Sequence, residues 1–122
     1  MIEAIIAMGC NGEVGLEDGL PWPHNPADMK WFKEVTMGKV CVVGHNTAKT
    51  LPYLQGRSVI QLCDWETPED LIELFPDLII IGGPKTYKLW EPYIDRYYIS
   101  RIRGNYPADT YLKEWAPWLK TT

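Results

Sequence analysis

The stretch "DLIIIGGPKTYKLW", residues 77 to 90, decides the fold of this 122-residue chain. Its first half is so continuously apolar that a strand at 77–83 must be covered on both faces, as in the middle of a parallel sheet. Its second half begins a helix at Pro84, because proline is favoured at the first helical position. A buried strand that runs directly into a helix predicts an α/β fold.

The same alternation extends in both directions from this stretch. Further strands are predicted at 2–8, 39–44, 58–62 and 96–102, each rich in β-branched residues and closed by turn residues. Helices are predicted after Asn25 and Thr67, because each of these capping residues precedes a proline. Strands that alternate with helices imply right-handed crossovers, so we expect a doubly wound, mainly parallel sheet. Such sheets bind ligands beyond the carboxyl ends of their strands.

Composition narrows the class of protein. With 46% hydrophobic and 23% charged residues, the chain should form one globular domain over residues 1–122 and not a disordered segment. The net charge of -4 argues against nucleic acid as a partner. No apolar run is long enough to cross a bilayer, so we expect no membrane association and a cytoplasmic protein. Cys10, Cys41 and Cys63 have no metal-ligand spacing, so we expect reduced thiols and no metal site.

Two turns follow predicted strands at the edge where ligands bind. "GHNT", Gly44 to Thr47, offers backbone N–H groups that suit a phosphate. "IGGPKT", Ile81 to Thr86, has paired glycines that let a ligand approach the backbone closely. Ordinary strand-to-helix turns have similar sequences, so the residues leave both interpretations open.

A third segment, "GLPWPHNPADMKWFK" at 19–33, carries a single carboxylate, Asp28. If Asn25 caps the helix, Asp28 is its third residue, where an acid stabilises the helix dipole. However, Phe32 lies one turn further along the same face. A carboxylate beside an aromatic ring on a core-facing stripe is costly without hydrogen-bond donors, and a ligand could supply them.

Taken together, the motifs resemble the dihydrofolate reductase family. "NGEVG", "LPWPHNPADMKWFK", "GHNT", "LQGR" and "IGGPKTY" occur in the family's order and with similar spacings over about residues 1 to 110. The resemblance implies the family's doubly wound, mainly parallel sheet. Because the given sequence ends with "DTYLKEWAPWLKTT", we expect the usual C-terminal antiparallel hairpin to be missing.

The resemblance implies hydride transfer from NADPH to 7,8-dihydrofolate, giving 5,6,7,8-tetrahydrofolate. Asp28 matches the acid that accepts hydrogen bonds from the pterin, and Trp22 matches a tryptophan that holds an ordered water near it. Phe32 packs on the substrate, and Arg57 binds the carboxylate of its glutamate tail. Ser100 supports the acid. The pterin and nicotinamide pocket is lined by Ile6, Ala7 and Ile81.

The resemblance also implies a cofactor site. Its implied residues are Ala7, Gly15, Leu16, Leu20, Gly44, His45, Asn46, Thr47, Leu62, Cys63, Asp64, Gly82, Gly83, Pro84, Lys85 and Thr86. Residues 15–20 match the mobile loop that closes over the nicotinamide. His45 replaces a more basic residue common beside the adenosine 2′-phosphate, and Asp64 places an acid there. An acid repels that phosphate, so NADH is not excluded as an alternative to NADPH.

Two other functions stay open at this stage: a non-catalytic folate- or nucleotide-binding or structural protein with the same fold, and a reductase of a related heterocycle. Without a terminal hairpin, the strand at 96–102 lies at the edge of the sheet with unpaired backbone groups. The basic residues Arg96, Arg101 and Arg103, or the tryptophan-rich tail at 115–118 folded back, are alternative ways to protect this edge. The simplest solution is a second copy, so we expect a homodimer through residues 96–102, with Trp115 and Trp118 at or near the contact.

Overall fold

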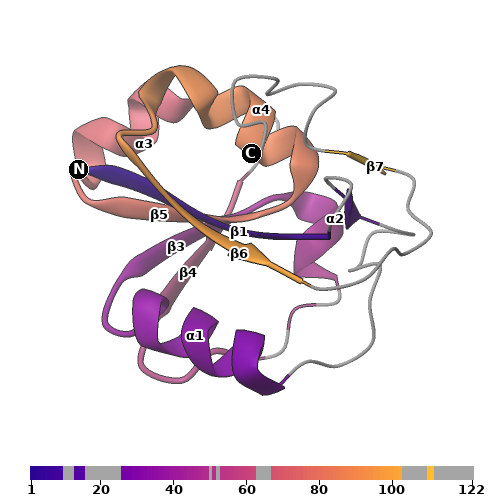
Figure 1. Ribbon diagram of the computed structural model, residues 1–122. Coiled ribbons are helices and arrows are strands. Elements are labelled where there is room, and N and C mark those ends of the chain that lie inside the picture. Colours follow the sequence, from indigo (N-terminus) through magenta and orange to yellow (C-terminus); the bar gives the residue numbers. More distant parts are fainter. Residues whose placement is uncertain are drawn as a thin grey trace.

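Five parallel strands form the main sheet, in the order β4-β3-β5-β1-β6 (Figure 1). The computed structural model describes residues 1–9, 13–15, 26–49, 51, 53–62, 67–102 and 110–111. The five strands are Ile2–Met8 (β1), Val40–Val43 (β3), Ser58–Gln61 (β4), Leu78–Gly82 (β5) and Arg96–Arg101 (β6). The strand expected at 77–83 is thus the central one, and the prediction of a parallel α/β sheet is confirmed.

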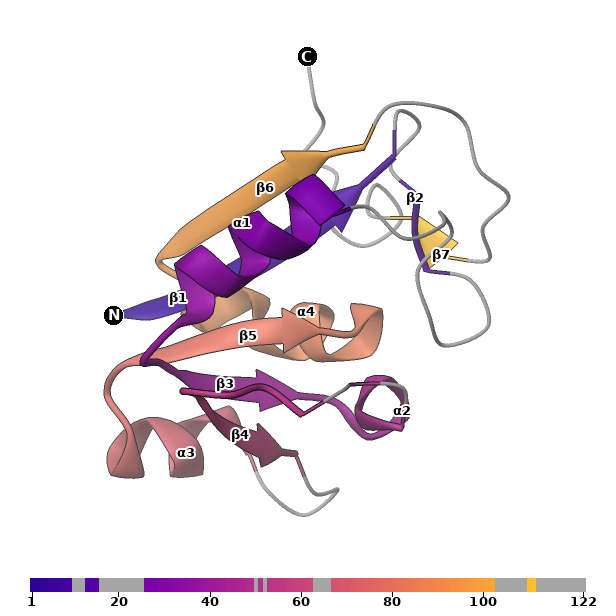
Figure 2. The same cartoon turned by 90° about the horizontal axis from the view of Figure 1, so that it is seen from below.

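Helices cover both faces of this sheet (Figures 1 and 2). Their bounds are Pro26–Thr36 (α1), His45–Ala48 (α2), Pro68–Leu74 (α3) and Pro84–Trp90 (α4), with a 3-10 turn at Glu91–Tyr93 (η1). α1 lies on one face, and α3 and α4 lie on the other. The helix starts predicted at the three prolines are confirmed, although the expected cap Asn25 lies outside the described residues.

Alternating positions of the strands build a separate core on each face. Ala4, Ile6 and Ile80 point toward α4 and pack in one cluster with Trp90. Ile5 and Ile79 point the opposite way, into a second cluster that the half-buried Phe32 of α1 covers. All five residues of β5 are buried, because this strand supplies both layers. This double role is the physical reason for its unbroken apolar sequence.

The start of α3 shows how local sequence fixes a helix end. The backbone N–H of Asp70 donates to the Thr67 hydroxyl at 3.3 Å, and the N–H of Thr67 donates to the Asp70 carboxylate at 3.5 Å. This reciprocal capping box satisfies two donors that the helix leaves unpaired, and Pro68 needs none.

A short antiparallel pair was not predicted from the sequence. Glu13–Gly15 (β2) pairs with Thr110–Tyr111 (β7) in a separate two-stranded sheet. Strands of two or three residues are too short to show a period of two, so no pattern marked them. Within the described residues, no antiparallel strand joins the main sheet, and β6 pairs with β1 alone. Trp115 and Trp118 lie outside the described residues.

Cys41 lies in β3 as a free, fully buried thiol, and burial raises its pKa. Cys10 and Cys63 lie outside the described residues. No described helix is both long enough and apolar enough to span a bilayer.

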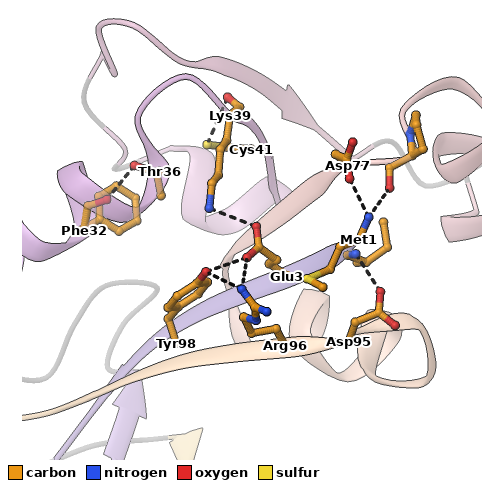
Figure 3. Close-up of polar contacts among 12 residues, drawn as sticks. Met1, Glu3, Phe32, Thr36, Lys39, Cys41, Asp77, Asp95, Arg96 and Tyr98 are labelled. Atoms are coloured by element: carbon orange, nitrogen blue, oxygen red, sulfur yellow. Dashed lines mark hydrogen bonds and ion pairs between the residues drawn. The ribbon is translucent and has the colours of Figure 1, made fainter.

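A polar cluster holds α1 near the amino ends of the strands (Figure 3). The Glu3 carboxylate accepts hydrogen bonds from Lys39 Nζ at 3.0 Å and from the Tyr98 hydroxyl at 2.7 Å, and Arg96 lies 4.0 Å away. The Tyr98 ring in turn meets Trp31 of α1 edge-on, with 6.3 Å between ring centroids. Burial alone would raise the pKa of Glu3, but the hydrogen bonds and the two cations lower it below its ordinary value.

A lowered folded-state pKa makes Glu3 stabilising at neutral pH. This stabilisation is present above the unfolded pKa of about 4.3 and is lost as the pH falls through the folded value. Glu3→Gln should therefore lower the free energy of unfolding by about 1 to 2 kcal/mol near neutral pH, and by much less near pH 3. Urea unfolding at both pH values measures this difference. Asp77→Asn is the control, because Asp77 binds only the exposed amino terminus among the described residues; equal losses in the two variants would contradict a special role for Glu3.

Candidate active site

Most of the predicted site residues that the structure describes lie where strands of the main sheet end, whereas Arg57 lies directly before the start of β4. α2 follows β3 and α4 follows β5, so both helices begin at the same edge (Figure 2). The amino end of α1 and the carboxyl end of β6 lie toward this edge as well. The edge therefore combines helix starts with polar side chains from strands, as expected for ligand sites in open parallel sheets.

Asp28 is the third residue of α1 and is half-buried. Burial raises the pKa of its carboxyl, and a hydrogen bond from the Ser100 hydroxyl partly offsets that rise. Ser100 lies on β6 in register with Ala7 of β1, so two strands and one helix meet around the acid. A carboxylate held in this way can accept further hydrogen bonds from a ligand that carries N–H groups.

Tyr87 is a buried polar residue that the sequence did not single out. Its hydroxyl donates to the carbonyl of Ile5 at 2.6 Å and is buried in the core. Burial raises the pKa of Tyr87, and the charge of Asp28 raises it further, so the phenol stays protonated beside the acid. One sequence feature could have revealed this residue: a tyrosine occupies a core-facing position of α4 where a phenylalanine would fill the same space. A buried hydroxyl needs a hydrogen-bond partner, so its presence indicates a polar contact.

Phe32 lies one turn beyond Asp28 on α1 and forms an apolar wall with its neighbours. It packs half-buried against the cluster that contains Ile5 and Ile81, together with Val35 and Leu51. An apolar surface therefore lies one helical turn from the acid, and such a surface suits a flat or apolar group.

Arg57 lies at the far end of α1. Its Nε donates to the Gln55 carbonyl at 3.1 Å, and its Nη1 donates to the Thr36 hydroxyl at 3.1 Å. The Thr36 hydroxyl donates to the Phe32 carbonyl at 2.7 Å (Figure 3). Thr36 closes the helix eight residues after Asp28, which corresponds to about 12 Å along the axis at about 1.5 Å per residue. An acid and a guanidinium thus mark the two ends of one helix.

The two predicted phosphate-binding turns are interlocked. The Gly44 N–H donates to the Gly82 carbonyl at 2.8 Å. A Cβ at Gly44 would overlap the Thr86 hydroxyl, and a Cβ at Gly83 would overlap the Thr47 hydroxyl. Only glycine permits this approach. The turns therefore bring backbone N–H groups and two hydroxyls together at one edge.

His45 begins α2 beside the end of β4. Its Nδ1 lies 2.9 Å from the side-chain nitrogen of Gln61, an exposed contact. When Gln61 donates to Nδ1, the ring proton lies on Nε2, and His45 presents an N–H donor. Gln61 was not among the predicted residues. No described group of three or more His, Cys, Asp or Glu side chains is arranged to hold a metal ion.

The remaining predicted residues divide into four groups. Ile6 is buried on the α4 face, away from α1, whereas Ile5 faces α1. Leu62 and Pro84 are half-buried and Lys85 is exposed, each directly beside a strand end. Gly15 belongs to β2, and Asn46 belongs to α2. The residues that lie outside the described part of the chain are Leu16, Leu20, Trp22, Cys63 and Asp64.

Comparisons with known proteins show what the whole chain is similar to. The family model described as "Dihydrofolate reductase" matches residues 1–121. The dihydrofolate reductase of Haemophilus influenzae is 27% identical over 130 residues, which cover 93% of this chain and 81% of that protein. A dihydromethanopterin reductase of Methylorubrum extorquens is 26% identical over 117 residues, covering 88% of this chain and 87% of its own. Among solved structures, dihydrofolate reductase from Enterococcus faecalis complexed with NADP(H) and RAB-propyl matches with a TM-score of 0.79 and 29% identity, covering 91% of this chain and 76% of that one.

The hydrogen bond from Ser100 gives a direct test of the electrostatics at Asp28. Because this bond lowers the pKa of Asp28, Ser100→Ala should raise that pKa further above its ordinary value. Carboxyl carbon NMR of the aspartates across a pH titration measures the shift. Ser58→Ala removes an exposed hydroxyl on β4 and serves as the control. An unchanged or lower pKa of Asp28 in Ser100→Ala would contradict the contact.

Proposed function

The chain belongs to the dihydrofolate reductase family, and from this premise we propose how its residues divide the reaction. The protein is an enzyme that reduces 7,8-dihydrofolate to 5,6,7,8-tetrahydrofolate with NADPH. The observation that carries the residue assignment is the pair of polar anchors on α1. Asp28 with Ser100 marks one end of the helix, and Arg57 with Thr36 marks the other.

We assign Asp28 to the pterin ring. Its ionised carboxylate accepts hydrogen bonds from a ring N–H and from the amino group of the pterin, and these donors stabilise the charge that burial disfavours. The Ser100 hydroxyl holds the carboxylate in place while the ring binds. We assign to Trp22, as the family resemblance implies, an ordered water through which a proton reaches the ring nitrogen N5.

The rest of the substrate extends along α1. Phe32 packs against its aromatic middle, and Ile81 and Ala7 line the pocket nearer the acid. Arg57 binds the carboxylate of the glutamate tail, because a guanidinium fork matches a carboxylate with two parallel hydrogen bonds. Arg57 thereby favours a substrate with an acidic tail over a pterin ring alone.

We assign the interlocked turns to the cofactor. The close approach of Gly44 to the Thr86 hydroxyl and of Gly83 to the Thr47 hydroxyl joins the two turns, and backbone N–H groups at the start of a helix suit the phosphate groups of the cofactor. Bound NADPH supplies the hydride from its nicotinamide ring. We place His45 and Gln61 at the adenosine end, where an imidazole N–H suits a ribose hydroxyl as well as a phosphate. NADH therefore stays open as a second donor.

Asp28→Asn tests whether this acid acts on the substrate or merely begins a helix. The variant should lose about 1.5 to 3 kcal/mol of transition-state stabilisation, which is about ten- to hundredfold in kcat/KM for dihydrofolate. Because burial raises the pKa of Asp28, its charge costs stability at neutral pH, so the variant should be at least as resistant to unfolding as the parent. Absorbance at about 340 nm follows NADPH oxidation, and urea unfolding measures stability.

Asp70→Asn is the matched control for this experiment. Asp70 is also the third residue of its helix and also follows a proline at the first position, but it lies on α3, which covers the opposite face from α1. It should lose capping stability and keep the parental kcat/KM. If the two variants lose activity equally, or if Asp28→Asn retains full activity, Asp28 is only a helix-start acid.

We further propose that two copies pair through residues 96–102. β6 lies at the edge of the sheet, and its four central residues are half-buried without a second strand beside it in the described part of the chain. Exposed backbone groups on such an edge favour pairing with another strand. We also propose a cytoplasmic location, which the free thiol of Cys41 supports, because thiols stay reduced in the cytosol.

Sedimentation velocity at micromolar concentration tests the dimer. We expect a species of twice the chain mass of 14.0 kDa. A single species at the chain mass across the concentration range would overturn the proposal.

A further inference from the structure

Thr36 carries a buried hydroxyl that the proposed reaction does not use. The residue is completely buried at the end of α1, although most residues of that helix are exposed or half-buried. A buried hydroxyl is costly unless it is hydrogen-bonded. Here the single proton goes to the Phe32 carbonyl at 2.7 Å, and the oxygen accepts from Arg57 at 3.1 Å. Both contacts therefore fix the orientation of one hydroxyl.

The guanidinium of Arg57 is held at two points. Nη1 donates to Thr36, and Nε donates to the Gln55 carbonyl at 3.1 Å. A planar group bound through two different nitrogens cannot rotate without breaking one of these bonds. Side chains fixed in advance lose less conformational entropy when they bind a ligand. Two hydrogen bonds therefore orient the guanidinium of Arg57.

We infer that Thr36 is a positioning residue that orients Arg57 for the carboxylate tail of the substrate. This inference rests on the proposed function, because it presumes that Arg57 binds that tail. It adds that the helix carrying Asp28 also sets the angle of the guanidinium at its other end. The Thr36 hydroxyl connects the Arg57 guanidinium to the Phe32 carbonyl of α1. The residues proposed to bind the middle and the tail of the substrate therefore form one hydrogen-bonded unit.

Thr36→Val tests the inference, because valine keeps the shape and removes the hydroxyl. The KM for dihydrofolate, divided by the KM for a 7,8-dihydropterin without a glutamate tail, should rise about tenfold, which corresponds to about 1.4 kcal/mol. The effect should fall on KM for the tailed substrate and spare kcat. Thr36→Ser keeps the hydroxyl and should restore the parental ratio.

Controls separate positioning from general stability. Thr67→Val removes a capping hydroxyl on α3 and should lower stability without changing the ratio. If Thr36→Val does not fold, Thr36→Ala removes the same hydroxyl with no added bulk and takes its place. A parental ratio in a folded Val or Ala variant, or failure of Thr36→Ser to restore it, would overturn the inference.

Arg57→Leu separates this inference from the proposed function. If Arg57→Leu raises KM equally for both substrates, the assignment of the tail to Arg57 is wrong. If Arg57→Leu is selective and Thr36→Val is not, only the role of Thr36 is wrong. If both single variants are selective for the tailed substrate, the double variant should have the same ratio of KM values as Arg57→Leu alone. In that background there is no guanidinium for Thr36 to orient.

Discussion

The hydrogen bond between the Ser100 hydroxyl and the Asp28 carboxylate joins α1 to the edge strand of the sheet, and the active site depends on it. Burial makes the charge of Asp28 costly, and the bond compensates only in part. A carboxylate in this state favours a ligand that brings more donors. The buried charge lowers the stability of the empty protein, and hydrogen bonds from the substrate compensate for it. Functional sites commonly lower stability in this way in return for binding.

The other contacts of α1 fix the position of the helix that carries Asp28. The helix buries only Thr36 completely, so apolar burial alone fixes its position weakly. Polar contacts supply the rest: Ser100 near its start, the Glu3 cluster through Tyr98 and Trp31, and Arg57 at its end. Directional bonds at several points suit a helix that must accept a ligand without shifting.

Sequence patterns predicted the helices and strands of the main sheet because burial on one or both faces leaves a period or an unbroken apolar run. They could not tell which way the apolar residues of β1 point. Ile5 faces α1 and Ile6 faces α4. Because both residues are isoleucine, the sequence pattern does not show which of them faces which helix. Thr36 and Tyr87 were not predicted, because Arg57, which donates to Thr36, and the Ile5 carbonyl, which accepts from Tyr87, are distant in the sequence and only the folded chain brings them near.

A crystal structure of the enzyme with folate and NADP⁺ tests the central claim most directly. It should show the pterin amino group and a ring N–H on the Asp28 carboxylate, with Ser100 still bound to it. The tail carboxylate should lie on Arg57, whose guanidinium keeps its bond to Thr36. A pterin ring placed away from Asp28, or a tail that leaves Arg57 without contact, would contradict the account.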